Sequence, residues 1–247
     1  MLIKKADGRF WEIDLIRGVA IILMIFFHIL YDLNHYSITK IRLYTGPISY
    51  IAYLSASIFI IIVGISLTIS HSKSNINLLK NEMLKKFIKR GIIIFILGMI
   101  ITGVSYIYIP ERYVIFGILH FIGISIILSI PFIYYKKANL ILGLLFIIIG
   151  IYLKTLKFDF NLLIPLGFVP NRFFTIDYFP IFPWFGVVLF GIAIGNYIYP
   201  NSKRIFSMID YSYNPIIKAL CFLGRHSLLI YFLHQPILIG LLFLLIL

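Results

Sequence analysis

Ionisable residues recur along one face of the first hydrophobic segment of the chain. In chain order they are Asp14, Arg17, His28, Asp32 and His35. At about 100° per residue in a helix, the five side chains fall within an arc of about 60°. Ionisable groups inside a bilayer are costly, so they generally face a bundle interior or a water-filled cavity. An aligned row of them predicts a reaction or transport path through a membrane.

His28 and Asp32 are one helical turn apart, which is the spacing of a general base and a group that orients it. A carboxylate holds a histidine in one tautomer and stabilises its charged form. The imidazole then accepts a proton from a hydroxyl or an amine. The alternative is a histidine that hydrogen-bonds another helix. His35 is either a proton relay at the outer end of the helix or, as we favour, an ordinary loop residue.

Asp14 and Arg17 are spaced i, i+3, so they are expected to pair on one helix face. The guanidinium of Arg17 is a donor fork that suits a phosphate group entering from the cytoplasm. Gly18 would allow a ligand or a neighbouring helix to approach closely. Lys89 and Arg90, in the second basic loop, are expected to add phosphate contacts. The alternative for Asp14 and Arg17 is an ion pair that anchors the helix at the interface.

Further candidate residues lie in two other apolar segments. His120 stands between two glycines in the fourth segment, and by its depth it is expected near His28. In the last segment Ser227, Tyr231 and His234 share a second polar row of about 60°. Two polar rows in so apolar a chain predict a shared cavity. The alternative is that His120 packs helices and that the second row only joins them.

The composition indicates a polytopic membrane protein. Of 247 residues, 61% are hydrophobic and only 13% are charged, whereas about a quarter are charged in soluble domains. No linker divides residues 1–247, so we expect a single all-α membrane domain. The net charge of +13 indicates basic cytoplasmic loops rather than nucleic-acid binding. The lone Cys221 excludes an internal disulfide, and no metal-ligand cluster is expected.

The hydropathy pattern predicts about seven transmembrane helices, each needing about 20 apolar residues. The expected spans are Ile13–Leu33, Ile48–Ser70, Phe87–Ile109, Val114–Tyr134, Leu140–Leu156, Pro180–Tyr199 and Ala219–Leu247. Lys4, Lys5 and Arg9 precede the first span as they would in a signal peptide. That span is longer than the hydrophobic region of a signal peptide and lacks a small-residue cleavage site, so we expect a retained helix.

The distribution of Lys and Arg predicts the orientation of the chain in the plasma membrane. The second, fourth and sixth loops hold most of the basic residues, so the N-terminus is expected inside and the C-terminus outside. Arg17 then lies near the cytoplasmic face. His28 lies roughly 21 Å farther along the helix than Asp14, about two-thirds of the way across a core of roughly 30 Å.

Several segments, in the same order along the chain, resemble one family. The pattern Asp14-x-x-Arg17-Gly18-x-Ala20 followed by His28 resembles the first helix of transmembrane acyltransferases of the acyltransferase-3 type. The bacterial and archaeal branch related to heparan-alpha-glucosaminide N-acetyltransferase is more similar still. The segments shared with that branch are Arg9 with Ile13-Asp14, His28 with Asp32, Phe116–His120, Pro180–Gly186 and Ser227–Pro236.

The resemblance implies an acyl donor such as acetyl-CoA and no metal. It also implies an acceptor, often a sugar, that is modified on the far side of the membrane. The lysosomal member has asparagine where this chain has His28, and its proposed catalytic histidine lies nearer the outer loop. Either His28 or His35 is therefore the candidate base. The implied partners are the bilayer, acyl-CoA and a glycan or lipid-linked sugar, with a homodimer left open.

The favoured hypothesis is a seven-helix acyltransferase in which His28, oriented by Asp32, activates a hydroxyl or an amine. One competing hypothesis is a proton-coupled transporter that uses the same residues as a relay. The other is a non-catalytic membrane component whose polar rows bind partner helices. The acyltransferase hypothesis predicts dependence on acyl-CoA, and the transporter hypothesis predicts dependence on a proton gradient. The non-catalytic hypothesis predicts copurification with a partner.

Overall fold

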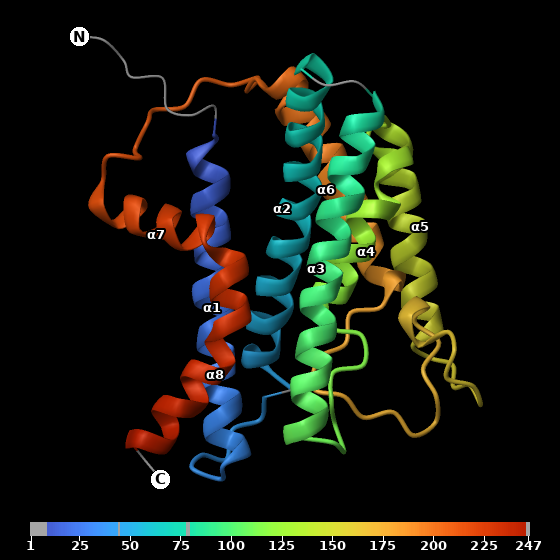
Figure 1. The fold of residues 1–247 in the computed structure, drawn as a ribbon, viewed down its shortest axis with the longest axis vertical. Coiled ribbons are helices and arrows are strands. Elements are labelled where there is room, and N and C mark those ends of the chain that lie inside the picture. Colours follow the sequence, from blue (N-terminus) through green and yellow to red (C-terminus); the bar gives the residue numbers. More distant parts are fainter. Residues whose placement is uncertain (1–8, 44, 78–79, 246–247) are drawn as a thin grey trace. The chain divides into compact units, whose positions relative to one another are not determined.

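The chain folds as an all-α protein (Figure 1). The computed structural model describes residues 9–43, 45–77 and 80–245. Lys4 and Lys5 lie outside these residues. The described part holds eight α-helices: α1 (Trp11–His35), α2 (Pro47–Asn77), α3 (Lys80–Tyr108), α4 (Ile118–Leu128), α5 (Lys137–Leu153), α6 (Ile181–Ile198), α7 (Pro215–Arg225) and α8 (Ser227–Leu245). Three 3₁₀ turns, η1 (Ile130–Phe132), η2 (Ile164–Leu166) and η3 (Pro200–Ser202), complete it.

Five helices in the described residues are long and apolar enough to cross a membrane. They comprise α1, α6, α8 and most of α2 and α3, whereas α4 and α5 are apolar but shorter. The sequence therefore predicted the membrane class correctly. The count of seven spans and the orientation of the termini stay predictions.

Two predicted spans differ from the helices observed. The fourth, Val114–Tyr134, is realised as α4 followed by η1, because Pro131 lacks the N–H that a continuing helix needs. The seventh, Ala219–Leu247, is divided at His226 into α7 and α8, and its last two residues lie outside the described part. Helix α7 begins earlier than expected because the Asn214 side chain accepts hydrogen bonds from the N–H groups of Ile216 and Ile217.

The second basic loop is mostly helical. Helix α2 continues to Asn77 and α3 already begins at Lys80. Lys89 and Arg90 therefore lie on helix α3 and not in a loop, and both are exposed. The expectation that they lie in a loop is wrong, because the basic residues continue a helix rather than break it.

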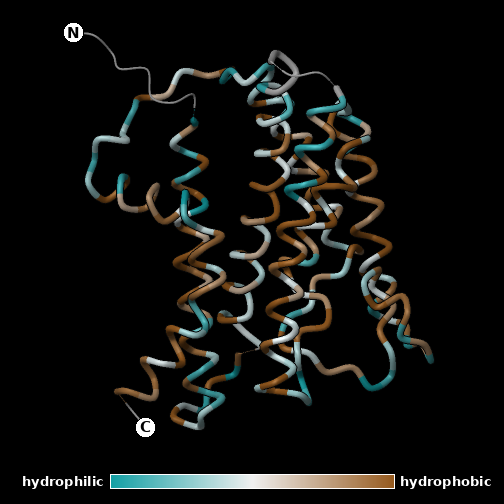
Figure 2. The backbone as a smooth tube through the Cα atoms, in the orientation of Figure 1, coloured by the Kyte–Doolittle hydropathy of each residue, from teal (hydrophilic) through white to brown (hydrophobic). Residues whose placement is uncertain are grey.

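Contacts divide the chain into two compact units. Unit 1 comprises residues Met1–Phe59 and Met208–Leu247, and so contains α1, the first part of α2, α7 and α8. Within it, α8 runs beside α1, and α7 crosses the first half of α1 (Figure 1). The Ser55 hydroxyl of α2 donates to the Ala20 carbonyl of α1 at 2.9 Å. Hydrophobic residues fill the middle of α1, with hydrophilic residues toward its ends (Figure 2).

Unit 2 comprises residues Ile60–Ser207. Helix α3 packs on α4, and α5 packs on α6. Each pair meets at facing glycines: a Cβ added at Gly91 would lie 2.7 Å from the Gly123 carbonyl oxygen, and one added at Gly143 would lie 2.9 Å from that of Gly186. Small residues at such contacts allow apolar helices to pack closely without a hydrophobic driving force.

Candidate functional site

Helices α1 and α8 bring four polar residues together inside unit 1. The rings of His28 and His234 lie edge to face, with their centroids 4.6 Å apart. Gln235 Nε2 donates a hydrogen bond to Asp32 Oδ1 at 2.6 Å. We call His28, Asp32, His234 and Gln235 the polar cluster. The two polar rows predicted from the sequence therefore meet, at least in these residues.

Backbone carbonyls set the tautomer of both histidines in the polar cluster. His28 Nδ1 lies 2.8 Å from the Met24 carbonyl oxygen, and His234 Nδ1 lies 2.6 Å from that of Tyr231. A carbonyl oxygen only accepts, so in each ring Nδ1 carries the proton. Nε2 of each neutral ring then has a free lone pair, which is the state that a general base requires.

Asp32 does not have the partner predicted from the sequence. The N–H of His28 is directed to the Met24 carbonyl, and Asp32 Oδ1 accepts from Gln235. The prediction that Asp32 orients His28 is therefore wrong. The carbonyl one turn back is already within reach of Nδ1, and the Gln235 amide reaches Asp32 from α8. Gln235 was not predicted as a site residue, although its position next to His234 was a usable signal.

The polar cluster leaves hydrogen-bonding atoms unsatisfied. Asp32 is 4% exposed and His234 is 9% exposed. Asp32 Oδ2, His234 Nε2 and Gln235 Oε1 are buried and have no hydrogen-bond partner among the described residues. An unsatisfied buried polar atom costs about 1–3 kcal/mol, and natural proteins contain few of them. In the described residues, these three atoms belong to one contact between α1 and α8.

The predicted pairing of Asp14 and Arg17 is confirmed. Arg17 Nη1 donates to Asp14 Oδ1 at 3.1 Å and lies 3.5 Å from the Gly224 carbonyl oxygen of α7. The Arg17 side chain keeps 22% of its surface exposed. Gly18 does permit a close approach, and the neighbour is α7: a Cβ at Gly18 would collide with the Leu220 carbonyl oxygen.

The remaining candidates on α1 and α8 lie beyond the core of the polar cluster. His35 is exposed in the last turn of α1 and stacks on Tyr31, with centroids 6.1 Å apart. The Tyr231 ring lies 5.4 Å from that of His234. Ser227 is the first residue of α8, roughly 10 Å along the helix before His234. The structure therefore groups Tyr231 with His234 and places Ser227 about two turns away.

His120 belongs to unit 2, and both of its ring nitrogens have partners. The Gly117 N–H donates to Nδ1 at 3.2 Å, so Nε2 carries the proton and faces Thr102 Oγ1 at 3.3 Å. Thr102 in turn donates to the Val114 carbonyl at 2.7 Å. This satisfied network joins α3 to α4 and favours the packing alternative. The expected proximity of His120 to His28 stays a prediction.

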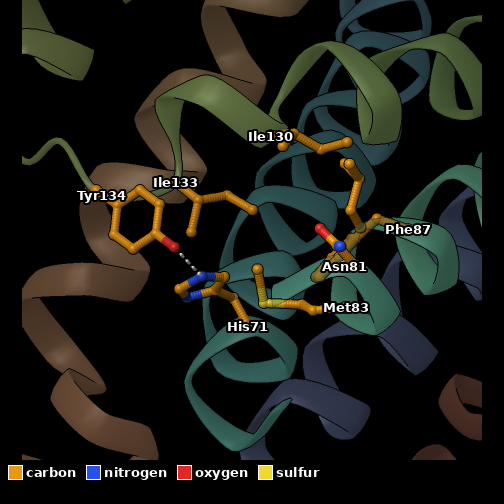
Figure 3. Close-up of a pocket in the computed structure, with 8 residues that line it drawn as sticks. His71, Asn81, Met83, Phe87, Ile130, Ile133 and Tyr134 are labelled. Atoms are coloured by element: carbon orange, nitrogen blue, oxygen red, sulfur yellow. Dashed lines mark hydrogen bonds between the residues drawn. The ribbon is translucent and has the colours of Figure 1, made fainter. Parts of the chain in front are cut away.

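Unit 2 also contains a small pocket of about 140 Å³ (Figure 3). His71 Nε2 and Tyr134 Oη form a hydrogen bond of 3.0 Å at its edge. The rest of the lining is mainly apolar, including Met83, Phe87 and Ile133. No site residue predicted from the sequence lines this pocket, and His71 was not singled out from the sequence.

The fold and the site define an integral membrane protein with two packed imidazoles, each with its Nδ1 directed to a backbone carbonyl. A family model described as heparan-alpha-glucosaminide N-acetyltransferase, catalytic, matches residues 9–236. The chain therefore belongs to this membrane acetyltransferase family, and the match includes the whole polar cluster. No curated protein and no solved structure matches the chain.

Proposed function

We propose that the protein transfers an acyl group, acetyl foremost, from acyl-CoA on the cytosolic side to an acceptor on the opposite side of the membrane. The acceptor is a hydroxyl or an amine of a glycan or a lipid-linked sugar. The observation that carries this proposal is the lone pair that the Nδ1 contact leaves on Nε2 of His28, in a chain that belongs to a family of acetyltransferases. The excess of Lys and Arg in alternate loops supports the direction.

In the proposed reaction, His28 Nε2 accepts the proton of the attacking hydroxyl or amine. The acceptor oxygen or nitrogen forms a bond to the thioester carbonyl carbon, and the carbon–sulfur bond of the donor breaks. The departing thiolate then takes the proton from His28, so the enzyme returns to its starting state. General-base catalysis of this kind contributes about 10²- to 10⁴-fold.

Arg17 is proposed to bind a phosphate of the donor. Its guanidinium is held by Asp14 but remains partly exposed, and an arginine fork suits the geometry of phosphate oxygens. Lys89 and Arg90 are exposed cations on α3 that we propose as further phosphate contacts. The donor is a substrate here.

The proposal is tested with the purified protein in lipid nanodiscs, acetyl-CoA labelled in the acetyl group and an extract of envelope glycans and lipids. We expect His28→Ala to lower label transfer by about 10²- to 10⁴-fold. The matched control is His35→Ala, which removes the exposed imidazole of the same helix and should leave transfer near the parental rate. If His35→Ala abolished transfer and His28→Ala did not, His35 would be the base.

A different result would reject the proposal altogether. If the parental protein neither transfers label nor binds acetyl-CoA, acyl transfer is wrong. Substrate flux that follows a proton gradient in the same protein would then identify the polar cluster as a transport relay.

A further inference from the structure

We propose that Asp32, Gln235 and His234 form the subsite for the acyl acceptor, and that this acceptor presents several O–H or N–H donors beside the group that is acylated. The inference rests on the proposed function and specifies the chemistry of its second substrate. It also gives Asp32 a role different from the one predicted from the sequence.

The free atoms of the polar cluster all accept hydrogen bonds. Asp32 Oδ2 is a carboxylate oxygen, Gln235 Oε1 is an amide oxygen, and His234 Nε2 carries a lone pair because Nδ1 holds the proton. Acceptors cannot satisfy one another, so these three atoms need donors from outside the cluster. A hydroxyl or ammonium group supplies such donors, and a hydrocarbon does not.

The hydrogen bond between α1 and α8 determines which atoms remain for a ligand. Gln235 donates its Nε2–H to Asp32 Oδ1, which leaves Oε1 and Oδ2 as the unpaired atoms of the two groups. A buried carboxylate with only part of its hydrogen-bonding capacity used is costly. A bound donor recovers that cost, so a ligand with donors is favoured over a shape-matched ligand without them.

The subsite lies next to the proposed base. Asp32 is one turn after His28 on α1, a rise of roughly 6 Å, and Gln235 adjoins His234, whose ring packs against that of His28. Hydroxyl or amine groups held here would place a neighbouring nucleophile within reach of the His28 imidazole. An acceptor with a single hydroxyl would lack this anchoring and would bind weakly.

His120 gives an internal comparison for a structural histidine. Its two ring nitrogens both have partners among Gly117 and Thr102. In unit 2 the ring of this packing histidine is thus satisfied, although Ser125 Oγ and Asn139 Oδ1 are buried there without a partner among the described residues. The polar cluster differs from these isolated atoms because three unsatisfied acceptors lie in one contact between α1 and α8, which favours a ligand.

The test compares two acetyl acceptors that share one primary hydroxyl. Methyl glucoside keeps three further hydroxyls, and 2-(hydroxymethyl)tetrahydropyran has none. With the protein in nanodiscs, we expect Gln235→Leu and Asp32→Asn each to raise the KM for methyl glucoside about tenfold or more, as expected for a lost hydrogen bond involving a charged group. The KM for acetyl-CoA and that for the single-hydroxyl acceptor should change little.

The matched control is Phe243→Leu, which alters an apolar contact farther along the same two helices and should leave all three KM values unchanged. Asp32→Asn keeps the size of the side chain, so it tests the subsite even if Gln235→Leu does not fold. Glucosamine serves as a third acceptor: a preference for it that is lost in Asp32→Asn would identify an ammonium rather than a hydroxyl as the bound donor.

The subsite proposal is overturned if the variants affect the two hydroxyl acceptors equally or lower only kcat. If the parental protein transfers no acetyl group, acyl transfer fails separately, and binding of methyl glucoside is measured directly by saturation-transfer NMR. Binding that is lost in Gln235→Leu would still support the subsite, and absence of binding to the parental protein would reject it.

Discussion

Helix α1 makes two contacts of opposite character within unit 1. Its first half meets α7 backbone to backbone, because Gly18 and Gly224 leave no room for a side chain. Its second half meets α8 through polar side chains, with Gln235 bonded to Asp32 and His28 packed on His234. The first contact is closed, whereas the second retains unpaired acceptor atoms.

The difference shows how one helix serves two purposes. A contact in which two backbones meet fixes the position of a helix and leaves no space for a ligand between them. A contact with unsatisfied polar atoms is less stable by itself and becomes favourable when a ligand supplies the missing donors. We therefore expect glycine variants at the α7 contact to alter folding and variants of the polar cluster at the α8 contact to alter substrate binding.

The largest effect on folding is expected for Gly224→Ala. The new Cβ would collide with the Asp14 carbonyl oxygen, and backbone atoms cannot move aside as a flexible side chain does. We expect a loss of about 1–3 kcal/mol or more in the free energy of unfolding, measured by denaturant titration in detergent. Gly240→Ala on α8 is the control, because its Cβ would have no atom within 4 Å. An equal loss in both variants would contradict the closed contact.

Cys221, the only cysteine of the chain, reports on the same contact. It is 3% exposed, its thiol lies 3.3 Å from the Trp11 carbonyl oxygen, and burial raises the pKa of the thiol. Labelling by a maleimide at pH 7 should be at least about tenfold slower in the folded protein than in the denatured protein. It should accelerate as the pH rises toward the elevated pKa. Rapid labelling of the folded parental protein would show that α7 does not stay on α1.

Arg17→Lys is expected to have a moderate and selective effect. Lysine keeps the positive charge but loses the planar fork that suits a phosphate. We expect the KM for acetyl-CoA to rise about tenfold, with the KM for the acceptor unchanged. Arg225→Lys is the control, because Arg225 is an exposed arginine at the end of α7. A matching rise in both variants would indicate a general charge effect and not a phosphate site.

The smallest effect is expected at the end of the α8 contact, where α1 ends. The rings of Tyr36 and Phe243 lie edge to face with centroids 5.6 Å apart, and such pairs contribute about 0.5–1.5 kcal/mol beyond burial. Tyr36→Leu should lower the free energy of unfolding by that amount and leave acetyl transfer unchanged. A loss of transfer larger than the loss of stability would extend the functional region of the α8 contact to Tyr36.

The sequence was sufficient for the class of fold and for local geometry on one helix. The pairing of Asp14 with Arg17 follows from i, i+3 spacing, and the all-α membrane class follows from apolar runs. The division of the last apolar run at His226 was not predicted, because the run remains apolar on both sides of the turn. Hydropathy measures the preference for lipid and does not record where a helix bends.

Partner choice inside the site could not be predicted from one helix. His28 and Asp32 are spaced i, i+4, which predicted that they would contact each other. In the structure each hydrogen-bonds a third residue instead. Met24 lies four residues before His28, just as Asp32 lies four residues after it, and the Met24 carbonyl is the group that contacts the ring. The partner of Asp32 is the Gln235 amide, which belongs to α8. Single-helix periodicity gives the face on which a side chain lies but not which of several nearby acceptors it uses.

The bond between Asp32 and Gln235 joins residues that are 203 positions apart in the chain. At ribosomal rates of about 5–20 residues per second, roughly 10–40 s separate the synthesis of its two ends. During that interval the carboxyl group of Asp32 has been made but its amide partner has not. The proposed subsite therefore cannot form until α8 has been made, and the nascent chain passes through a stage that has α1 to α7 but not the bond between Asp32 and Gln235.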